Sequence, residues 1–592
     1  MLSYTIFPEP HHHTYRVRLA LTMPAEGGLT LVMPVWTPGS YVLREYAGRI
    51  GAVTARGDGP EVRLRQTAKA EWVLDAGSFP AGSPVEIRWE AFAYSVGIHD
   101  AFIDSDRGVI NPPALFIYPK TALDGTLPIE VRFRAPGWQV HCALPETDGA
   151  WVTDTIDELL DSPYALTRED GRGAHVFTVE ACGAPHEIVI TGVESLDPRR
   201  ISEDLRRIFE TEIAFWDPRG RKAPFERYLL ILHLGPGLYG GLEHAAGTML
   251  LEDPANLPAE CETEAPKNYH DFLVLVAHEY FHVWLVKRLK PSRFLPYDLS
   301  EEGYTRDLWI FEGITSHFES LLARRAGVIT EKECRLHMER RMNNALGREG
   351  FYEMTLAESS FCAWTKLYRP TASTPYTQIS YYTKGALASL ILDEELRERS
   401  GGAESLEKFL SDWFLSVRDE IAARRWKGLP DHGLGDLILR FTGVDVTELL
   451  RDLIDKEQPK SFWSLRIKKA LEAAGLRAEP DDSAPAAFRL AGLRTDVKNG
   501  RVTAGYIPSC SPAYGAGIFA GDEIIAIDGE RVTPDSVNRQ IERARGRVVT
   551  VHRFRGAKLL TGMLDLTSPL PDDFLDQLPK KLVPIEDQKS EA

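Results

Sequence analysis

Residues 272–286 read Phe-Leu-Val-Leu-Val-Ala-His-Glu-Tyr-Phe-His-Val-Trp-Leu-Val, an apolar run that is too long for a single strand. Basic residues and then a proline follow at 287–291, which predicts that a buried helix ends there. Inside the run, His278, Glu279 and His282 form the pattern His-Glu-x-x-His. On a helix, this spacing places both imidazoles on one face with a carboxylate between them, which is the arrangement that zinc-dependent hydrolysis requires.

Two other interpretations of this motif stay open. The pattern can arise by chance in a chain with 16 histidines, and two buried histidines can be satisfied by backbone carbonyls. The second explanation leaves an acid in the middle of an apolar helix, where an unpaired charge is costly. We therefore favour a metal site with His278 and His282 as ligands and Glu279 as the base that takes a proton from the attacking water.

A zinc site of this kind needs a third protein ligand, and two glutamates are candidates. Glu301 lies in a polar stretch and has the features of a solvated loop acid. Glu312 lies in a second apolar helical pattern that runs to about Ala326, so it is the favoured ligand. Glu319 returns to the same helix face and could orient a ligand histidine, although a solvated or ion-paired acid fits equally well. Two histidines and one glutamate leave a coordination position for water, which is typical of a catalytic site.

The length and composition are those of an ordinary soluble protein with several domains. With 592 residues the chain is too long for one core, and roughly three or four domains are expected. The formal net charge of −17 argues against nucleic acid as a partner. The six cysteines show no paired spacing and are expected to be free thiols. The N-terminus lacks a signal-peptide pattern and no uncharged apolar run could span a bilayer, so we expect a cytoplasmic protein without membrane contact.

The sequence pattern predicts a multidomain α+β protein with four segments. Strand-like alternation recurs in residues 1–195 and predicts a β-rich, sandwich-like domain. Residues 196–480 contain one strand-like run, 228–234, and otherwise mostly helical patterns, and the histidine motif falls among them. Strands return in 486–567, and the segment 568–592 is rich in Pro, Asp and Lys and is expected to be a polar tail or an extended surface segment.

Several blocks spread along the chain point to one protein family. They are Pro-Val-Trp-Thr-Pro-Gly-Ser-Tyr at 34–41, Gly-Gly-Leu-Glu-His at 240–244, the histidine motif at 278–282, Trp-Ile-Phe-Glu-Gly-Ile-Thr at 309–315, Tyr-Tyr-Thr-Lys-Gly at 381–385, and the Gly-rich segment 511–529. Together they resemble the PDZ-domain-containing glycyl aminopeptidases, a family of gluzincin zinc metallopeptidases. The resemblance covers nearly the whole chain, and several ordered blocks are more specific than any single motif.

The resemblance implies a thermolysin-like, mainly helical catalytic domain that binds one Zn²⁺ per chain. It implies that His278, His282 and Glu312 hold the metal and that Glu279 is the base, and so it decides between the two candidate glutamates. One position departs from the family pattern, because Leu285 stands where an asparagine is expected. That position is not a ligand, so the departure concerns hydrogen bonding around the ligands rather than metal binding.

Other blocks imply residues that contact the substrate. Tyr382 takes the place of a tyrosine that stabilises the tetrahedral intermediate in related enzymes, and a cleft-wall aromatic is the alternative. Gly240 and Gly241 would let the substrate backbone approach closely, and Glu243 would pair with the free α-ammonium group of a peptide. An ordinary acid on a turn is the alternative for Glu243. His244 would line the cleft or hold Glu243 in place.

The segment 511–529 resembles part of a bacterial-type PDZ domain. Such domains accept an extended peptide as an added strand and hold its C-terminal carboxylate on backbone N–H groups. The resemblance therefore implies a C-terminal peptide as a possible partner of residues 486–567. A module that packs against the catalytic domain and binds nothing is an equally good interpretation.

These observations predict a zinc-dependent aminopeptidase that releases N-terminal residues from peptides with a free N-terminus. The preference for small residues such as glycine and alanine is implied by the resemblance alone. One alternative is a zinc endopeptidase whose cleft stays open beyond Glu243. The other is a peptide-binding scaffold in which the PDZ-like domain carries the function and the zinc site is vestigial.

Overall fold

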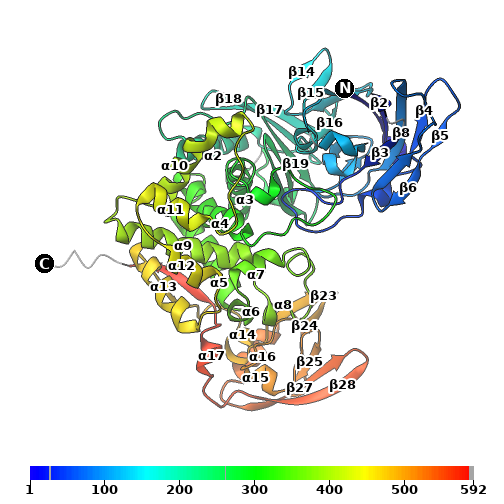
Figure 1. Cartoon of the computed structure of the whole chain (residues 1–592). Helices are drawn as coiled ribbons and strands as arrows, with labels where there is room; N and C mark the ends of the chain where they lie inside the picture. Colours follow the sequence, from blue (N-terminus) through cyan, green and yellow to red (C-terminus); the bar gives the residue numbers. More distant parts are fainter. Residues whose placement is uncertain (26–27, 124, 261, 586–592) are drawn as a thin grey trace. The chain divides into compact units, whose positions relative to one another are not determined.

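The computed structural model describes residues 1–25, 28–123, 125–260 and 262–585 (Figure 1). The chain forms two compact units, each assembled from separate stretches of sequence. The first contains Met1–Thr305, Phe318–Thr330 and Glu407–Leu437. The second contains Arg306–His317, Glu331–Leu406 and Ile438–Ala592.

The N-terminal part of the first unit consists mainly of strands, as its alternating sequence predicts. Burial alternates residue by residue along the second strand, because neighbouring side chains of a strand point to opposite faces. An eight-stranded sheet has the order β14 (Glu146–Thr147), β15 (Ala150–Thr153), β12 (Ile129–Phe133), β1 (Leu2–Glu9), β2 (Thr14–Thr22), β8 (Pro84–Phe92), β4 (Thr54–Arg56) and β5 (Val62–Arg63).

Two four-stranded sheets complete this β-rich region. One has the order β13 (Trp138–His141), β16 (Tyr164–Arg168), β10 (Arg107–Ile110) and β9 (Ala101–Ile103). The other has the order β11 (Tyr118–Pro119), β3 (Leu29–Val32), β7 (Glu71–Leu74) and β6 (Arg65–Ala68). A short helix, α1 (Ile156–Leu160), precedes β16, and Asp161 follows this helix directly.

A five-stranded mixed sheet follows the β-rich region in the same unit. Its order is β17 (Ala174–Ala181), β18 (Ala184–Thr191), β19 (Tyr228–Leu234), β21 (Gly247–Glu252) and β20 (Tyr239–His244). Strand β19 is buried along its whole length and pairs parallel with both neighbours, as a continuous apolar run predicts. Strand β20 is an antiparallel edge strand, so one side of its backbone is left unpaired within the sheet.

Helix α3 (Tyr269–Phe281) carries the histidine motif and packs against α2 (Pro198–Trp216). The sequence predicted a helix that continues to the basic residues at 287–291, but α3 ends at Phe281. The ring of His282 lies against the carbonyl of Leu285, and Val286 has a φ of 106°, which is incompatible with a helix. The predicted helix was therefore too long.

Helix α4 (Leu308–Arg325) matches the second predicted helix closely. The second unit adds α5 (Glu331–Leu346), α6 (Gly350–Glu353), α7 (Leu356–Phe361), α8 (Thr374–Thr377), α9 (Tyr381–Arg399), α12 (Thr447–Ile454) and α13 (Lys460–Ala473). Helices α10 (Leu406–Ala422) and α11 (Leu434–Thr442) each contain residues of both units. The region between the two β-rich parts is thus mainly helical, as predicted.

The C-terminal part of the second unit is again a sheet with short helices. The strands run in the order β23 (Thr495–Lys498), β24 (Arg501–Ala504), β25 (Glu523–Ile527), β27 (Val548–Arg555) and β28 (Lys558–Asp565), and β26 (Glu530–Arg531) also pairs with β25. Helices α14 (Ala486–Ala491), α15 (Pro512–Gly515) and α16 (Val537–Arg543) accompany them. Val502, Ile518, Ile524, Ile541 and Val551 lie in one buried apolar core.

The segment after residue 567 is more ordered than its composition predicted. It forms α17 (Asp572–Leu575) and β29 (Lys580–Pro584), and β29 pairs with β22 (Leu476–Pro480). Phe574 is fully buried and Leu582 nearly so, which supplies the apolar contact that holds the segment in place. The expectation of a polar tail from residue 568 is therefore wrong for the described residues up to 585.

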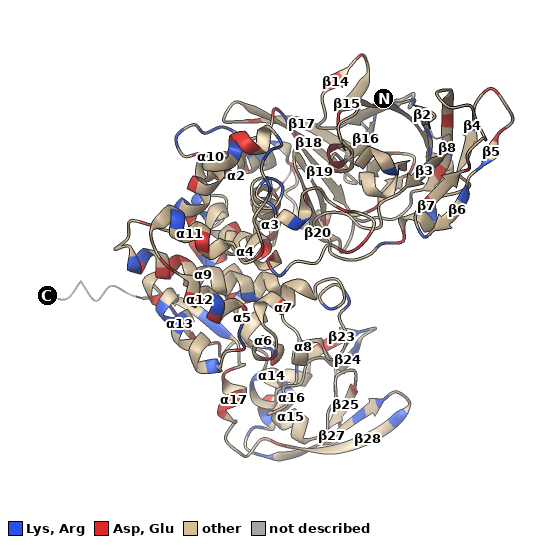
Figure 2. Cartoon of the chain, viewed as in Figure 1, with Lys and Arg blue, Asp and Glu red and all other residues tan. Residues whose placement is uncertain are grey.

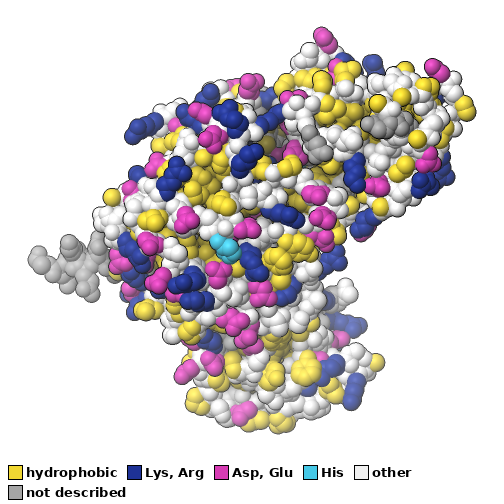
Figure 3. All heavy atoms as spheres, in the orientation of Figure 1, with side chains coloured by type: hydrophobic (Ala, Val, Ile, Leu, Met, Phe, Trp, Pro, Cys, Tyr) yellow, Lys and Arg dark blue, Asp and Glu magenta, His cyan; other side chains and the backbone are white. Residues whose placement is uncertain are grey.

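Acidic and basic residues alternate along the helices, strands and loops of both units (Figure 2). In the face that Figure 3 shows, the two signs of charge lie next to one another among apolar and neutral groups. Among the described residues, no helix is long and apolar enough to cross a membrane.

Candidate active site

The two motif histidines face one another at the end of α3. His278 lies in the last turn of the helix and His282 takes the C-cap position. Their Nε2 atoms are 3.1 Å apart, and the His282 side chain is almost fully buried. Two ring nitrogens that converge in this way are arranged to bind the same metal ion.

The other ring nitrogen of each histidine already has a partner. Nδ1 of His278 lies 2.6 Å from Oε2 of Glu319 on α4, and Nδ1 of His282 lies 2.9 Å from the carbonyl oxygen of Leu285. When each Nδ1 carries the proton, each Nε2 carries the lone pair with which an imidazole binds a metal ion. The partner of His282 is a backbone carbonyl, so the unexpected leucine side chain at 285 does not remove this hydrogen bond.

The remaining acids provide oxygen donors that suit a divalent cation. Ligand atoms of Glu243, Glu279 and His282 all lie within 4.8 Å of one another in the first unit. Glu312 is buried on α4, two turns before Glu319 and on the same helix face. Glu301 is exposed, as the sequence predicted for a loop acid. Two imidazoles with a buried carboxylate form a donor set that fits zinc.

Strand β20 passes directly over Glu279. A Cβ placed on Gly241 would lie 2.6 Å from Cγ of Glu279, so only glycine allows this approach. Gly240 has a φ of 154°, which L side chains rarely adopt. The two glycines thus bring the backbone edge of β20 that is unpaired within the sheet close to Glu279.

The side chain of Glu243 lies on the same strand and is 4% exposed. Among the described residues, its Oε1 has no hydrogen-bond partner. A buried carboxylate oxygen without a partner is costly, so the site is suited to a cationic ligand that would satisfy it.

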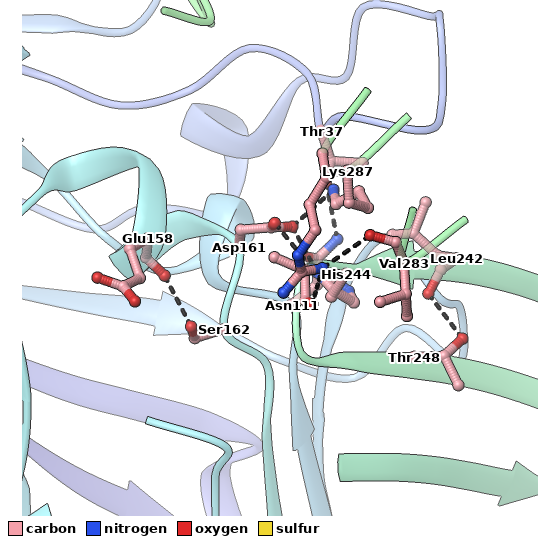
Figure 4. A network of polar contacts seen from close by, with 12 residues as sticks. Thr37, Asn111, Glu158, Asp161, Ser162, Leu242, His244, Thr248, Val283 and Lys287 are labelled. Carbon is pink, nitrogen blue, oxygen red and sulfur yellow. Dashed lines mark hydrogen bonds and ion pairs between the residues drawn. The ribbon is translucent and has the colours of Figure 1, made fainter. Parts of the chain in front are cut away.

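His244 belongs to a separate polar network rather than to the histidine pair (Figure 4). Its Nδ1 lies 3.1 Å from Oδ1 of Asp161, and the Ala245 N–H donates to Oδ2 of Asp161 at 3.0 Å. Lys287 Nζ lies 2.7 Å from Oδ1 of the same aspartate. Burial alone would raise the pKa of Asp161, but Lys287 and His244 together hold it well below its usual value. The network fixes the end of β20 to the β-rich region.

Tyr382 lies in the first turn of α9, within the second unit. Its hydroxyl group is 3.2 Å from that of Tyr368. Burial raises the pKa of Tyr382 well above its usual value, and Glu312 and Tyr368 add to the shift. The phenol therefore stays protonated at neutral pH and can act as a hydrogen-bond donor.

Helices α4 and α9 approach closely beside Glu312 and Tyr382. A Cβ on Gly313 would lie 2.6 Å from Cα of Gly385, so the backbones of the helices touch there. Gly313 directly follows Glu312, and Gly385 is one helical turn beyond Tyr382. The crossing fixes the two functional candidates relative to one another within the second unit.

Sequence reasoning missed three residues that shape the site. Asp161 and Lys287 look like ordinary charged residues in the sequence, because their pairing joins segments that are far apart in the chain. Tyr368 lies in a stretch without a regular pattern. No local signal in the sequence could have identified these contacts.

Known families and structures match the chain. The model of the M61 glycyl aminopeptidase family matches residues 271–388, and the model of the Peptidase M61 N-terminal domain matches residues 3–168. A crystal structure of an aminopeptidase N family protein from Idiomarina loihiensis is 30% identical, with a TM-score of 0.88, over 99% of this chain and 98% of that chain. An M1 zinc metallopeptidase from Deinococcus radiodurans is 15% identical, with a TM-score of 0.44, over 77% of this chain and 93% of that chain. Among proteins with curated descriptions, none matches the sequence significantly.

The two M61 models cover both the β-rich N-terminal region and the histidine motif. The match to the Idiomarina protein extends over almost the full length of both chains. The chain therefore belongs to the M61 glycyl aminopeptidase family.

Proposed function

We propose that this protein binds one zinc ion per chain and removes small N-terminal residues, such as glycine and alanine, from peptides. The observation that carries the proposal is the pair of Nε2 atoms, 3.1 Å apart, of His278 and His282, each with its Nδ1 already paired. Membership of the M61 family supports the substrate class. The size of the preferred residue rests on the family description alone.

His278, His282 and Glu312 are the proposed metal ligands. Support for Glu312 comes from its burial and from its place on the α4 face that also carries Glu319, the partner of His278. When bound, zinc would polarise the scissile carbonyl and lower the pKa of an attacking water. The fold of residues 196–480 around these ligands is proposed to be thermolysin-like.

Glu279 is the proposed general base. It is 5% exposed and lies directly beneath Gly241 of the edge strand β20. Its carboxylate would take a proton from the attacking water and pass it to the leaving amine. The substrate backbone would run along the unpaired side of β20, because the glycines leave that edge free of side chains.

Tyr382 is the proposed donor to the oxygen that becomes negative in the tetrahedral intermediate. Its raised pKa keeps the phenol protonated, so it can donate as the charge develops. Tyr368 is 3.2 Å from its hydroxyl group and would keep the ring in one orientation.

Glu243 is the proposed anchor for the free α-ammonium group of the substrate. Within the described part of the chain, Oε1 of its buried carboxylate has no hydrogen-bond partner, and an ammonium group would supply one. Hydrolysis of a glycyl anilide and of its N-acetylated form tests this assignment. We expect the free amine to be strongly preferred, and we expect Glu243→Ala to lose that preference. Equal cleavage of both substrates by the wild type would instead support an endopeptidase.

The β-rich module at 486–567 is proposed to be a PDZ-like domain. The strand and helix arrangement around one apolar core supports this proposal. Helix α14 lies along α16, where Ala487 N–H donates to Oδ1 of Asn538 at 3.0 Å. Binding of a C-terminal peptide to this module can be tested by titrating the full chain with a labelled peptide and with its C-terminal amide.

A further inference from the structure

The turn at 37–40 in the β-rich region lies against the proposed amine anchor. We infer that this turn closes the substrate cleft beyond Glu243 and thereby determines exopeptidase specificity. The inference rests on the proposed function of Glu243 and extends it, because it assigns a role to a second segment of the chain. This segment lies in the conspicuous Trp-Thr-Pro-Gly-Ser-Tyr motif, to which composition alone assigns no function.

The turn is held firmly by its flanking tryptophan. Trp36 is fully buried, and its indole N–H donates to the carbonyl oxygens of Asp298 at 3.0 Å and Glu301 at 2.8 Å. The backbone N–H of Val35 donates to the carbonyl of Leu299 at 2.8 Å. The motif is therefore tied to the segment that follows the histidine motif, all within the first unit.

The turn itself is tight. The N–H of Ser40 donates to the carbonyl of Thr37 at 3.1 Å, and Arg44 donates to Oγ of Ser40 at 2.7 Å. Pro38 restricts the backbone, and Gly39 has a φ of 91°, which favours glycine. A turn braced at both ends in this way can act as a fixed wall rather than as a flexible loop.

Gly39 lies directly against the anchor. A Cβ on this residue would lie 2.6 Å from Oε1 of Glu243 and 2.7 Å from Cδ1 of Leu242. Ligand atoms of Glu243, Glu279 and His282 also lie within 4.8 Å of one another. The carboxylate thus lies close both to the turn and to the catalytic candidates.

The position of Glu243 beside the turn limits how far a substrate can extend on its N-terminal side. The free α-ammonium group of a substrate can pair with Glu243, because no further chain atoms extend from this group toward the turn. An acylated amine or a preceding residue would have to pass through the turn at 37–40. The proposed anchor supplies attraction for the free amine, and the turn supplies steric rejection of longer chains.

The first test is Gly39→Ala, with Gly77→Ala as its matched control. Both glycines lie in the β-rich region at positive φ, 91° and 86°, but a Cβ on Gly77 meets no atom of the described residues within 4 Å. We expect Gly39→Ala to lower kcat/KM for a glycyl anilide by about tenfold, mainly through KM, because the anchor is displaced. Gly77→Ala should stay within about twofold of wild type. Similar values for the two variants would overturn the inference.

A double variant separates the effect of the contact between position 39 and Glu243 from a general loss of activity. Aspartate at 243 withdraws the carboxylate by one methylene group, so Gly39→Ala should cost little in the Glu243→Asp background. We expect the KM of the double variant to match that of Glu243→Asp alone, whereas its thermal midpoint should still fall because the new Cβ also meets Cδ1 of Leu242. Fully additive losses would show that Gly39 and Glu243 act independently, which contradicts the contact.

The second test loosens the turn without altering the anchor. Trp36→Phe removes the two indole hydrogen bonds, and Trp138→Phe is the control in the same region. We expect Trp36→Phe to raise the ratio of N-acetylglycyl to glycyl anilide hydrolysis about tenfold, and Trp138→Phe to leave it unchanged. An unchanged ratio in Trp36→Phe, together with a strong wild-type preference for the free amine, overturns only this inference. Equal wild-type rates on both substrates overturn the proposed function itself.

Discussion

Glu319 accepts a hydrogen bond from His278, because its Oε2 lies 2.6 Å from Nδ1 of that ring. The side chains are largely buried, with 12% of the histidine and 14% of the glutamate exposed. A carboxylate in this position fixes the tautomer in which Nδ1 carries the proton and Nε2 carries the lone pair that can bind a metal ion.

We predict that Glu319→Gln weakens zinc binding without abolishing it. Loss of a carboxylate partner of a metal-binding histidine typically costs about 10- to 100-fold in affinity. Competition with a chromophoric chelator measures the dissociation constant directly. A variant that binds zinc as tightly as the wild type would contradict the role of this pair.

Glu279→Gln should separate metal binding from catalysis. The amide is nearly isosteric, so the close approach of Gly241 is preserved, but it cannot take a proton from water. We expect kcat to fall by about 10²- to 10⁴-fold while zinc content stays at the wild-type value. Steady-state kinetics and metal analysis on the same preparation measure kcat and zinc content. Substantial retained turnover would contradict the role of Glu279 as the general base.

Tyr382→Phe should lower kcat with little change in KM. The phenol would donate only to the developing oxyanion, and loss of one such donor typically costs about 10²- to 10³-fold. Tyr368→Phe is a useful comparison, because Tyr368 contacts the hydroxyl group of Tyr382 but is not proposed to contact the substrate. We expect the Tyr368 variant to lose much less activity. A larger loss there than in Tyr382→Phe would contradict the assignment.

A buried lysine makes the stability of the second unit dependent on pH. Lys384 donates to the carbonyl oxygens of Phe351 and Met354 at 2.7 Å each, and burial lowers its pKa to about 7. The unfolded chain therefore holds a proton that the folded chain releases between about pH 7 and the ordinary lysine pKa of about 10.4. Stability should rise with pH through this window, because the unfolded state binds more protons.

Lys384→Met tests this linkage. Thermal midpoints should be measured at several pH values between 7 and 10. The midpoint of the wild type should rise with pH relative to that of the variant, which lacks the titrating group. Parallel curves for the two proteins would show that the ammonium group is not destabilised by burial. The comparison between proteins at each pH cancels the contributions of the other titrating groups.

The sequence predicted those parts of the site that lie close together in the chain. The spacing of His278 and His282 implies a shared face because both lie within one helical turn. The strand at 228–234 and the helix at 308–325 were also predictable, since each has a strong local pattern. The resemblance to a family added Glu243 and Tyr382, which have no local signal of their own.

Long-range contacts explain what the sequence could not predict. The early end of α3 depends on the unusual backbone of Val286, which no residue preference anticipates. The order of the last segment depends on the pairing of β29 with β22, about one hundred residues earlier in the chain. Likewise, the role inferred for Gly39 appears only when the turn is seen against Glu243.

The central claim is that His278, His282 and Glu312 together hold one catalytic zinc ion. Zinc content and glycyl anilide hydrolysis should be measured for Glu312→Gln and for the matched control Glu301→Gln, which changes an exposed acid. The account predicts one zinc per chain and full activity in the Glu301 variant, with loss of both in the Glu312 variant. Full zinc content and undiminished turnover in Glu312→Gln would contradict it.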